Sequence, residues 1–452
     1  MFHKILVANR GEIAVRIIRA CRNMGISSVA IYSREDANSF HVQLADQRVC
    51  IGEGPAKNSY LNMERIIMAA KNVGADAIHP GYGFLSENSR FVRMCQGNDL
   101  VFIGPTADVI DKMGNKSQAR ATMMEAGVPV VPGTKEPVYD TETALEMAKQ
   151  IGFPVMIKAS SGGGGKGMRV SESPEDFEFQ FNLAQRESAN AFADDTMYLE
   201  RYIQKPRHVE IQIMADTHGN VVALGDRDCS VQRNHQKLIE ESPSPAIDEK
   251  TREEMNRCAV LAAKTVGYTN AGTIEFIVSS TGEFYFMEMN TRIQVEHGVT
   301  EMVTGTDLIV EQIRVAAGLP LSFTQEDVKI RGHAIECRIN AEIPEKRFMP
   351  CPGLVKQIHL PAGNGVRVDT MLYTGYRIPS EYDSMIAKVI VHAPNREMAI
   401  RKMIGALDEM VVVGVETNLD FQYQIIRHPV FVQGKANTGF IEDVMNLKTG
   451  DR

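Results

Sequence analysis

The fold and site predictions for this chain rest on the stretch Phe286-Met287-Glu288-Met289-Asn290-Thr291-Arg292-Ile293-Gln294-Val295-Glu296-His297. From Glu288 onward its even positions are Glu, Asn, Arg, Gln and Glu, whereas most of its odd positions are apolar. Side chains on a strand point to alternate faces, so an extended conformation packs one face and places the charged and amide groups on the other. A solvated strand face shows the same alternation. A reactive site is indicated only in combination with the residues that come before.

A second strand is predicted directly before this stretch, by the run Thr273-Ile274-Glu275-Phe276-Ile277-Val278. The Ser-Thr-Gly triplet that follows is a turn signal, so the two strands are expected to form a hairpin. A four-residue loop, 280–283, pairs Ser279 with Phe284. Counting back from that pair places Glu275 directly opposite Glu288.

The two facing carboxylates indicate a metal site. Like charges directly opposite each other destabilise a strand ladder, and a divalent cation between them removes that penalty. Asn290 offers a further oxygen ligand on the same face. The set of Glu275, Glu288 and Asn290 therefore suits Mg²⁺ or Mn²⁺, which prefer hard oxygen ligands and leave positions for phosphate and water.

Composition bounds the class of protein. The chain has 452 residues, of which 44% are hydrophobic and 23% charged, as in a globular protein of two or three domains. A formal net charge of −8 gives no signal for nucleic acid, and no apolar run has the length of a membrane span. The seven cysteines are scattered without a CxxC pair, which indicates reduced thiols and a cytoplasmic location. The apolar run at the N-terminus predicts a first strand, not a signal peptide.

Residues 1–114 alternate strand and helix patterns and predict a doubly wound parallel sheet. Asn9-Arg10-Gly11-Glu12 stands where a dinucleotide fold would carry GxGxxG, and the missing glycines exclude that site. Pro80-Gly81-Tyr82-Gly83 follows a predicted strand, at the edge where open α/β sheets bind ligands. A tight turn that uses the φ freedom of glycine is the alternative.

Residues 115–330 are expected to form a central unit, with a lid subdomain at about 131–203. Within it, Gly162-Gly163-Gly164-Gly165-Lys166 lies between two predicted strands. Consecutive glycines leave backbone N–H groups unblocked, as a lid over phosphates requires. The segment is not a Walker A loop, because no GK[ST] opens a helix. A disordered linker is the alternative.

From Gly332 the pattern changes to antiparallel strands closed by two helices, and a C-terminal domain is expected at 331–446, with a tail at 447–452. The whole is thus an α/β and α+β protein. Arg338 lies in the first of these strands and needs an anionic partner or a surface position. Glu336, Arg338 and Asn340 share one face, so a solvated face is the open alternative.

The combination of a glycine lid, lysines and facing carboxylates fits metal-assisted phosphoryl transfer, in which positioning and charge neutralisation do the catalysis. Lys116 and Lys158 would hold phosphates or the nucleotide. Arg292 and Lys237, the latter in the polar loop predicted at 232–237, would hold an anionic acceptor. Glu296 could act as a base on that acceptor.

Four long motifs closely resemble the biotin carboxylase family of the ATP-grasp superfamily. They are Lys4-Ile5-Leu6-Val7-Ala8-Asn9-Arg10-Gly11-Glu12-Ile13-Ala14, His79-Pro80-Gly81-Tyr82-Gly83-Phe84-Leu85-Ser86-Glu87-Asn88, the glycine run through Met168, and Met287 to His297. The resemblance runs from about residue 2 to about residue 446. It implies an ATP-grasp unit with a mobile lid and ATP-dependent carboxylation by bicarbonate of biotin on a carrier protein. ATP would phosphorylate bicarbonate to carboxyphosphate, which yields CO₂ and phosphate, and the phosphate would take the ureido proton of biotin.

The resemblance also implies roles for individual residues. Glu296 would be the base, and Arg338 would stabilise the biotin enolate. Arg201 and Ile203 depart from the Lys and Leu of bacterial members, although recognition of adenine through the backbone should survive this. The implied sets are ATP at Lys116, Lys158, Gly164, Gly165, Glu200, Arg201, Ile203, His208, Gln232, His235, Glu275 and Glu288; two metal sites at Glu275, Glu288 and Asn290; bicarbonate at Lys237, Arg292, Gln294, Val295 and Glu296; and biotin at Tyr82 and Arg338.

Partners follow from the resemblance too. The sequence contains no Met-Lys-Met motif to accept biotin, so the biotin carboxyl carrier protein and the carboxyltransferase are expected on separate chains. This favours a homodimeric component of a dissociated bacterial acetyl-CoA carboxylase, which supplies malonyl-CoA for fatty acid synthesis. The alternatives are the same component of a pyruvate or other acyl-CoA carboxylase, an ATP-grasp carboxylate–amine ligase, and a non-enzymatic nucleotide-binding protein.

Overall fold

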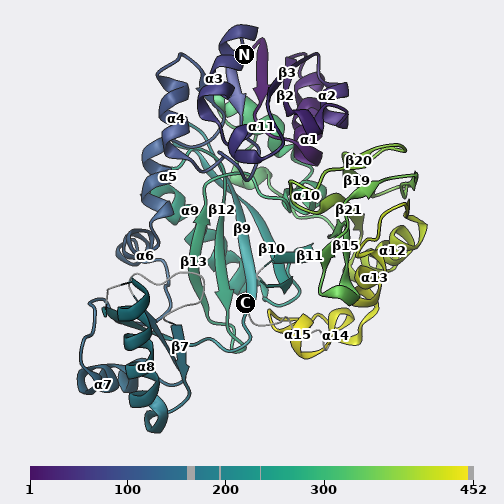
Figure 1. Cartoon of the computed structure of the whole chain (residues 1–452). Helices are drawn as coiled ribbons and strands as arrows, with labels where there is room; N and C mark the ends of the chain where they lie inside the picture. The colour runs from purple at the N-terminus through teal and green to yellow at the C-terminus, as the bar shows by residue number, and fades with distance from the viewer. Residues whose placement is uncertain (160–167, 193–194, 235, 446–452) are drawn as a thin grey trace.

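The computed structural model describes residues 1–159, 168–192, 195–234 and 236–445 (Figure 1). The N-terminal sheet is parallel, in the order β3-β2-β1-β4-β5. Ile5 and Val7 share a buried core with α1 and α11, and Leu6 shares one with α3 and α4, so helices cover both faces. The predicted doubly wound sheet is confirmed. Its elements are β1 Lys4–Val7, α1 Gly11–Asn23, β2 Ser27–Ser33, α2 Phe40–Leu44, β3 Gln47–Gly52, α3 Met63–Val73, β4 Ala77–His79, α4 Ser89–Gln96, β5 Val101–Phe102 and α5 Ala107–Gly114.

An antiparallel sheet of eight strands forms the centre of the molecule, in the order β13-β12-β9-β10-β11-β14-β21-β19. Along β9, Val209, Ile211 and Ile213 share a core with α9. The alternate residues from His208 to Gln212 point to the opposite face, which carries the charged groups. The elements are β9 Arg207–Ala215, β10 Val221–Arg233, β11 Gln236–Ser242, α9 Glu249–Thr265, β12 Asn270–Val278, β13 Phe284–Asn290, α10 His297–Thr304, α11 Leu308–Ala316, β14 His333–Asn340, β19 Val366–Thr370 and β21 Met385–Ala393.

This sheet crosses the expected boundary between the central unit and the C-terminal domain. β11 pairs with β14, with Ile239 opposite Cys337 and Glu240 opposite Glu336. The antiparallel character expected after Gly332 is confirmed, and its main strands extend the central sheet. The remaining elements there are β15 Glu342–Ile343, β16 Met349–Pro350, β17 Gly353–Leu354, β18 Gln357–His359, β20 Arg377–Ile378, α12 Arg396–Glu409, β22 Val411–Val413, α13 Leu419–Arg427, α14 Pro429–Val432 and α15 Phe440–Asp443.

A separate antiparallel sheet of three strands, β7-β6-β8, lies in the predicted lid subdomain and projects from the lower left of the molecule in Figure 1. Phe177 and Phe181 of α8 stack with ring centroids 5.7 Å apart in a core that includes Ile157 and Leu199. The predicted glycine run lies outside the described residues. The elements of this part are α7 Thr141–Ile151, β6 Val155–Ala159, β7 Met168–Ser171, α8 Pro174–Phe192 and β8 Met197–Arg201. Before them, α6 Lys116–Glu125 packs Ala119 and Met123 into the core of the central sheet.

Among the described residues, none of the helices combines the length and the apolar character that crossing a membrane requires.

Candidate active site

The hairpin of β12 and β13 has Glu275 paired with Glu288, as predicted. The predicted turn was wrong, because Val278 and not Ser279 pairs with Phe284. Gly282 has a φ of 89°, which permits a different turn, and the Ser279 amide donates to the Glu283 carbonyl at 2.8 Å. A register shift between Glu275 and Phe276 then restores the expected pairing of the two acids.

The alternation of the opening stretch does not correspond to one long strand. β13 ends at Asn290, and the segment 291–296 is irregular up to α10. The register shift also turns Met287 outward, with 40% of its surface exposed, although an apolar position in the packed row was predicted. Glu87 holds the irregular segment instead: the Thr291 amide donates to its Oε1 at 3.0 Å, and Arg292 Nε donates to its Oε2 at 2.9 Å.

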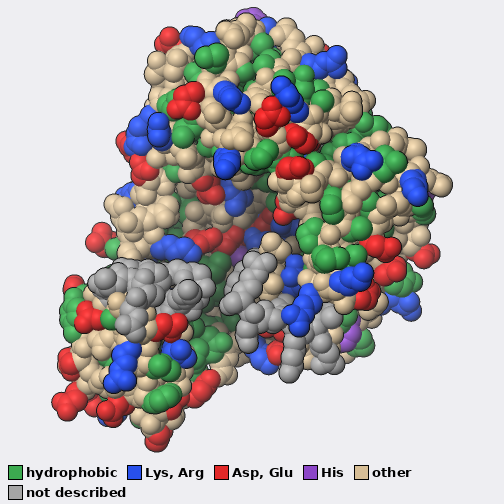
Figure 2. All heavy atoms as spheres, in the orientation of Figure 1, with side chains coloured by type: hydrophobic (Ala, Val, Ile, Leu, Met, Phe, Trp, Pro, Cys, Tyr) green, Lys and Arg blue, Asp and Glu red, His purple; other side chains and the backbone are tan. Residues whose placement is uncertain are grey.

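Lys237 lies at the centre of the charged face. Its ammonium Nζ donates to Glu210 Oε2 at 2.7 Å, to Glu275 Oε1 at 3.1 Å and to Glu296 Oε1 at 2.5 Å. These acids come from β9, β12 and the segment before α10, so one cation joins three elements. Figure 2 shows a hollow in which acidic and basic side chains gather. Gln294, also predicted here, donates to Glu275 Oε1 at 2.8 Å.

Arg227 supports this cluster from the fully buried middle of β10. Its guanidinium donates to Glu210 Oε1 at 2.6 Å and to Gln294 Oε1 at 2.8 Å. Neither Arg227 nor Glu210 was predicted as a site residue. The alternation of polar residues along the β9 sequence, from His208 to Gln212, marked the correct face.

Ion pairing determines the charge of the buried acids. Burial raises the pKa of Glu296, but Lys237, with Arg338 and Arg227 adding to it, lowers that pKa to about 2. Burial opposes ionisation of Glu275 as well, yet Lys237 and His208 hold its pKa below its usual range. The carboxylates are therefore ionised at neutral pH.

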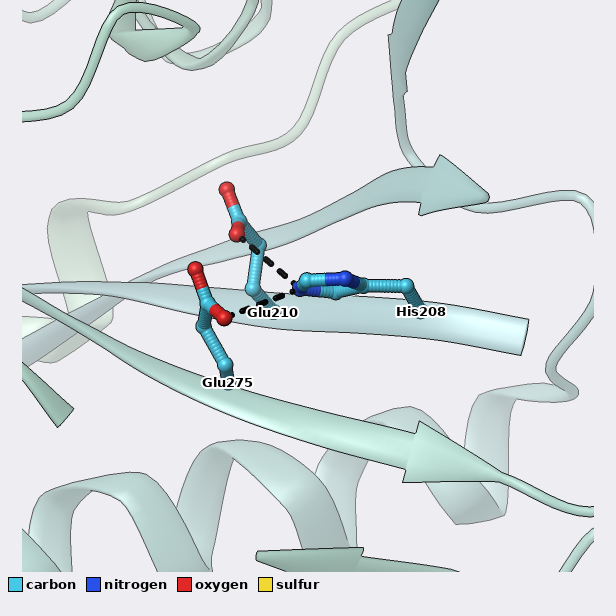
Figure 3. A group of neighbouring side chains, drawn as sticks. All are labelled: His208, Glu210 and Glu275. Atoms are coloured by element: carbon cyan, nitrogen blue, oxygen red, sulfur yellow. Dashed lines mark ion pairs between the residues drawn. The ribbon is translucent and has the colours of Figure 1, made fainter. Parts of the chain in front are cut away.

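His208 completes the charged cluster, and Figure 3 shows its ring directed at the carboxylates of Glu210 and Glu275. Its Nε2 lies 3.2 Å from Glu275 Oε2 and 3.6 Å from Glu210 Oε2. Burial and Lys237 lower the pKa of His208, but the two carboxylates outweigh them and raise it to about 9. The imidazole is thus a cation at neutral pH.

The donor set at the predicted metal position fits a hard divalent cation. Glu275 and Glu288 oppose each other, and Asn290 Oδ1 lies beside them on the strand, where it accepts from Arg292 Nη2 at 3.0 Å. All the candidate ligand atoms are oxygens, as Mg²⁺ or Mn²⁺ prefers. Lys116 Nζ approaches Glu288 Oε2 at 3.2 Å.

Most of the described nucleotide residues predicted from the sequence come from the lid sheet and from the central sheet. Lys158 of β6 forms an ion pair with Glu200 of β8, and Arg120 Nε is 3.6 Å from the same carboxylate. Arg201, the last residue of β8, donates to the Ile151 carbonyl at 3.0 Å. This hydrogen bond anchors the end of the strand, and the partly buried chain then runs on to Ile203. Gly164, Gly165 and His235 lie outside the described residues.

The predicted polar loop at 232–237 was wrong. Gln232 pairs with Lys237 and Arg233 with Gln236, so β10 and β11 continue through it as a hairpin. Asn234, with a φ of 48°, sits at the turn, a conformation that asparagine tolerates better than most residues. The hairpin, unlike a free loop, fixes Lys237 on the charged face.

Arg338 contacts two buried carboxylates, those of Glu296 and Glu240. Its Nη2 donates to Glu296 Oε2 at 2.9 Å, and its Nε donates to Glu240 Oε1 at 2.6 Å. The solvated face considered for Glu336, Arg338 and Asn340 was wrong, because Glu336 is fully buried and the other two residues are partly buried. Tyr82, from the N-terminal domain, donates its hydroxyl to a carboxylate oxygen of Glu12.

Comparison with known families and proteins covers nearly the whole chain. Residues 1–110 match the family described as the N-terminal domain of biotin carboxylase, and residues 336–443 match its C-terminal domain. Residues 115–324 match the ATP-binding domain of the carbamoyl-phosphate synthase L chain.

Individual relatives agree with these matches. Biotin carboxylase 1 of Bacillus subtilis is 56% identical over 98% of this chain and 100% of its own. A biotin carboxylase of Pseudomonas aeruginosa is 51% identical over 99% of both chains. The biotin carboxylase domain dimer of the Hydrogenobacter thermophilus 2-oxoglutarate carboxylase, solved with MgADP, ADP and bicarbonate, is 46% identical with a TM-score of 0.89 and full coverage of both chains. Motifs, fold and full-length similarity together show that this chain belongs to the biotin carboxylase family.

Proposed function

We propose that the protein is the biotin carboxylase of an acetyl-CoA carboxylase, and that it uses ATP and bicarbonate to carboxylate biotin on a carrier protein. This proposal rests on the position of the Glu296 carboxylate, which accepts from Lys237 with one oxygen and from Arg338 with the other. One ionised carboxylate thus stands between the residues assigned to bicarbonate and the residue assigned to biotin. The proposed domains are 1–114, 115–330 with the lid at about 131–203, and 331–446.

The first step is phosphoryl transfer to bicarbonate. Glu296, ionised through its contact with Lys237, takes the bicarbonate proton, and a bicarbonate oxygen bonds to the γ-phosphorus as the bond to ADP breaks. Arg292, Gln294 and the Val295 backbone hold the anion in position, while Lys116 and Lys158 neutralise phosphate charge. A divalent metal held by Glu275, Glu288 and Asn290 would supply further neutralisation of the phosphate oxygens.

The second step is transfer of the carboxyl group. Carboxyphosphate breaks its C–O bond to give CO₂ and phosphate, and the phosphate accepts the proton from the ureido nitrogen of biotin, which then bonds to CO₂. The negative charge that develops on the ureido oxygen lies near Arg338, and Tyr82 lines the same pocket. A guanidinium fixed by Glu240 and Glu296 is pre-organised for this role, because its orientation is set before biotin arrives.

The reaction itself is tested by mixing the protein with ATP, Mg²⁺, bicarbonate and free biotin. ADP release that biotin stimulates is the expected result, and its absence would overturn the proposal. A carboxylate–amine ligase would instead release ADP only with a carboxylic acid and an amine. A nucleotide-binding protein without activity would bind ATP and release no ADP under either condition.

The acyl acceptor is tested through the partners. The relative from Pseudomonas aeruginosa and a pyruvate carboxylase component of Methanothermobacter thermautotrophicus are each 51% identical to this chain, so sequence similarity alone does not choose between acceptors. Capture of the biotinylated carrier together with its carboxyltransferase, followed by assays with acetyl-CoA and with pyruvate, identifies the acceptor; malonyl-CoA is the expected product. The dimer named for the Hydrogenobacter relative supports a homodimer here, which sedimentation would establish.

Arg338→Ala is expected to separate the two steps. Loss of a group that stabilises developing charge should lower biotin carboxylation by about 10²–10³-fold. Bicarbonate-dependent ATP hydrolysis without biotin should fall much less, because Lys237 still binds Glu296. Both rates are measured on one preparation whose folding is confirmed by thermal unfolding. Equal losses in the two assays would contradict the role given to Arg338.

Glu288→Lys is expected to abolish ADP release, by roughly 10³-fold or more, because it places a second cation beside Lys116 where the metal should lie. The matched control is Glu283→Lys, which makes the same charge change at the exposed turn of the same hairpin. The control should retain full activity. Mg²⁺-dependent turnover in the Glu288 variant would refute the metal site.

A further inference from the structure

Lys388 is fully buried in the middle of β21, and none of the roles above uses it. Its Nζ donates to the Val295 carbonyl at 2.6 Å. Val295 lies in the irregular segment assigned to bicarbonate, directly before Glu296. In the sheet register Lys388 is also the partner of Arg338, so its side chain emerges on the same charged face.

The counter-charges of Lys388 come from two other parts of the fold. Glu12 Oε1, on α1 of the N-terminal domain, lies 3.4 Å from Nζ, and Asp369 Oδ2, on β19, lies 3.9 Å away. The same Glu12 oxygen accepts the hydroxyl of Tyr82. Lys388 therefore stands between the segment that carries Val295 and the carboxylate that fixes Tyr82.

Folding alone gives no reason for a lysine at this position. Removing an ammonium group from water is costly, and well-packed apolar residues usually serve a protein interior at least as well. The hydrogen bond to the Val295 carbonyl is charge-assisted and thus holds that oxygen more firmly than a neutral donor would. Since the peptide unit is planar, fixing the carbonyl also fixes the Glu296 N–H, which points the opposite way.

We infer that Lys388 is a positioning residue that sets the bicarbonate segment and Tyr82 in a fixed relation to each other, through Val295 on one side and Glu12 on the other. This inference rests on the proposed function, because it takes bicarbonate and biotin as the ligands of those two groups. Lys388 is assigned no contact with either substrate, and its effect is on how well both are held. The hydrogen bond and ion pairs of its Nζ involve none of the described nucleotide residues.

The test is the variant Lys388→Met, which keeps the length of the side chain and removes its charge. KM for bicarbonate, measured in ATP hydrolysis without biotin, and KM for biotin should each rise roughly tenfold, while KM for ATP stays within about twofold. A purely structural role would lower the unfolding temperature or the fraction of active protein and leave all three KM values unchanged. That pattern would overturn the inference.

Two further variants complete the experiment. Glu12→Gln keeps an oxygen that accepts from Tyr82 but removes the carboxylate that faces Lys388, so it should raise KM for biotin. This variant tests the inference even if Lys388→Met fails to fold. An unchanged KM for biotin would overturn the inference. Glu311→Gln is the matched control. It makes the same change in a buried carboxylate on α11 that accepts from Ser322 Oγ at 2.7 Å, so all three KM values should stay unchanged.

The outcome for the proposed function is read separately, from the unmodified protein. If the unmodified protein shows no ADP release that biotin stimulates, the proposed function fails before any variant is measured. If it shows that activity and the two variants leave KM for bicarbonate and biotin unchanged, only the role of Lys388 fails.

Discussion

Replacing Lys237 by methionine is expected to abolish ADP release and to destabilise the fold by about 3–5 kcal/mol. The ammonium of Lys237 contacts Glu210, Glu275 and Glu296, all of which are buried. Without it, three carboxylates share one buried space, and Arg227, His208 and Arg338 are the cations that still contact them. Removing one partner of a buried ionic group is costly because the other charges stay desolvated.

The catalytic loss has a related cause. Of the charges that lower the pKa of Glu296, that of Lys237 has the largest effect, and Lys237 is also assigned to bicarbonate. The control is Lys149→Met, the same substitution in the exposed pair with Glu146 at 2.7 Å, which should cost at most about 1 kcal/mol. Denaturant unfolding and ADP release are measured on both. Stability and activity equal to the control would show that the cluster does not depend on its central cation.

Replacing Glu296 by glutamine should lower the rate of bicarbonate-dependent ADP release by about 10²–10⁴-fold, the usual contribution of a general base. The amide retains the shape of the side chain and one oxygen acceptor, so Arg338 keeps a partner. Glu311→Gln makes the same change in a buried carboxylate that accepts from Ser322 Oγ at 2.7 Å, and it should leave the rate intact. If Glu296→Gln releases ADP as fast as Glu311→Gln does, Glu296 is not the general base.

The same variant has a consequence for acid stability. The pKa of Glu296 is about 2 in the folded protein, below the value of about 4.3 in an unfolded chain. Its stabilising contribution is therefore present above about pH 4.3 and is lost as the pH falls toward about 2, as linkage requires. Glu296→Gln should remove this part of the pH dependence, which unfolding curves between about pH 5 and pH 3 would detect.

The sequence predicted the elements whose residue pattern is local. The apolar run of β1 and the alternation in β9 and β12 marked strands, and counting from the turn placed Glu275 opposite Glu288, which the register confirms. The predicted pairing of Glu275 with Glu288 is correct although the turn differs from the predicted one. The one-residue register shift at Met287 compensates for the different turn. A bulge of this kind depends on packing and turn geometry and has no sequence pattern of its own.

The contacts that complete the site depend on residues far apart in the chain. Arg227 meets Gln294 across 67 positions and Arg338 meets Glu240 across 98, so no local pattern relates them. Arg292 was expected to share a strand face with Asn290, whereas it lies in an irregular segment held by Glu87, 205 positions earlier. The roles of these residues toward ATP, bicarbonate and biotin remain predictions that the variants above test.

The continuous ladder from β13 to β19 joins the predicted metal position on β12 and β13 to Arg338 on β14 through a single sheet. Changing their separation would break backbone hydrogen bonds between β11 and β14, each worth about 0.5–1.5 kcal/mol. The lid sheet, β7-β6-β8, belongs to no part of that ladder. Movement of the lid sheet, which carries Lys158 and Glu200, would therefore leave the distance between the predicted metal position and Arg338 unchanged.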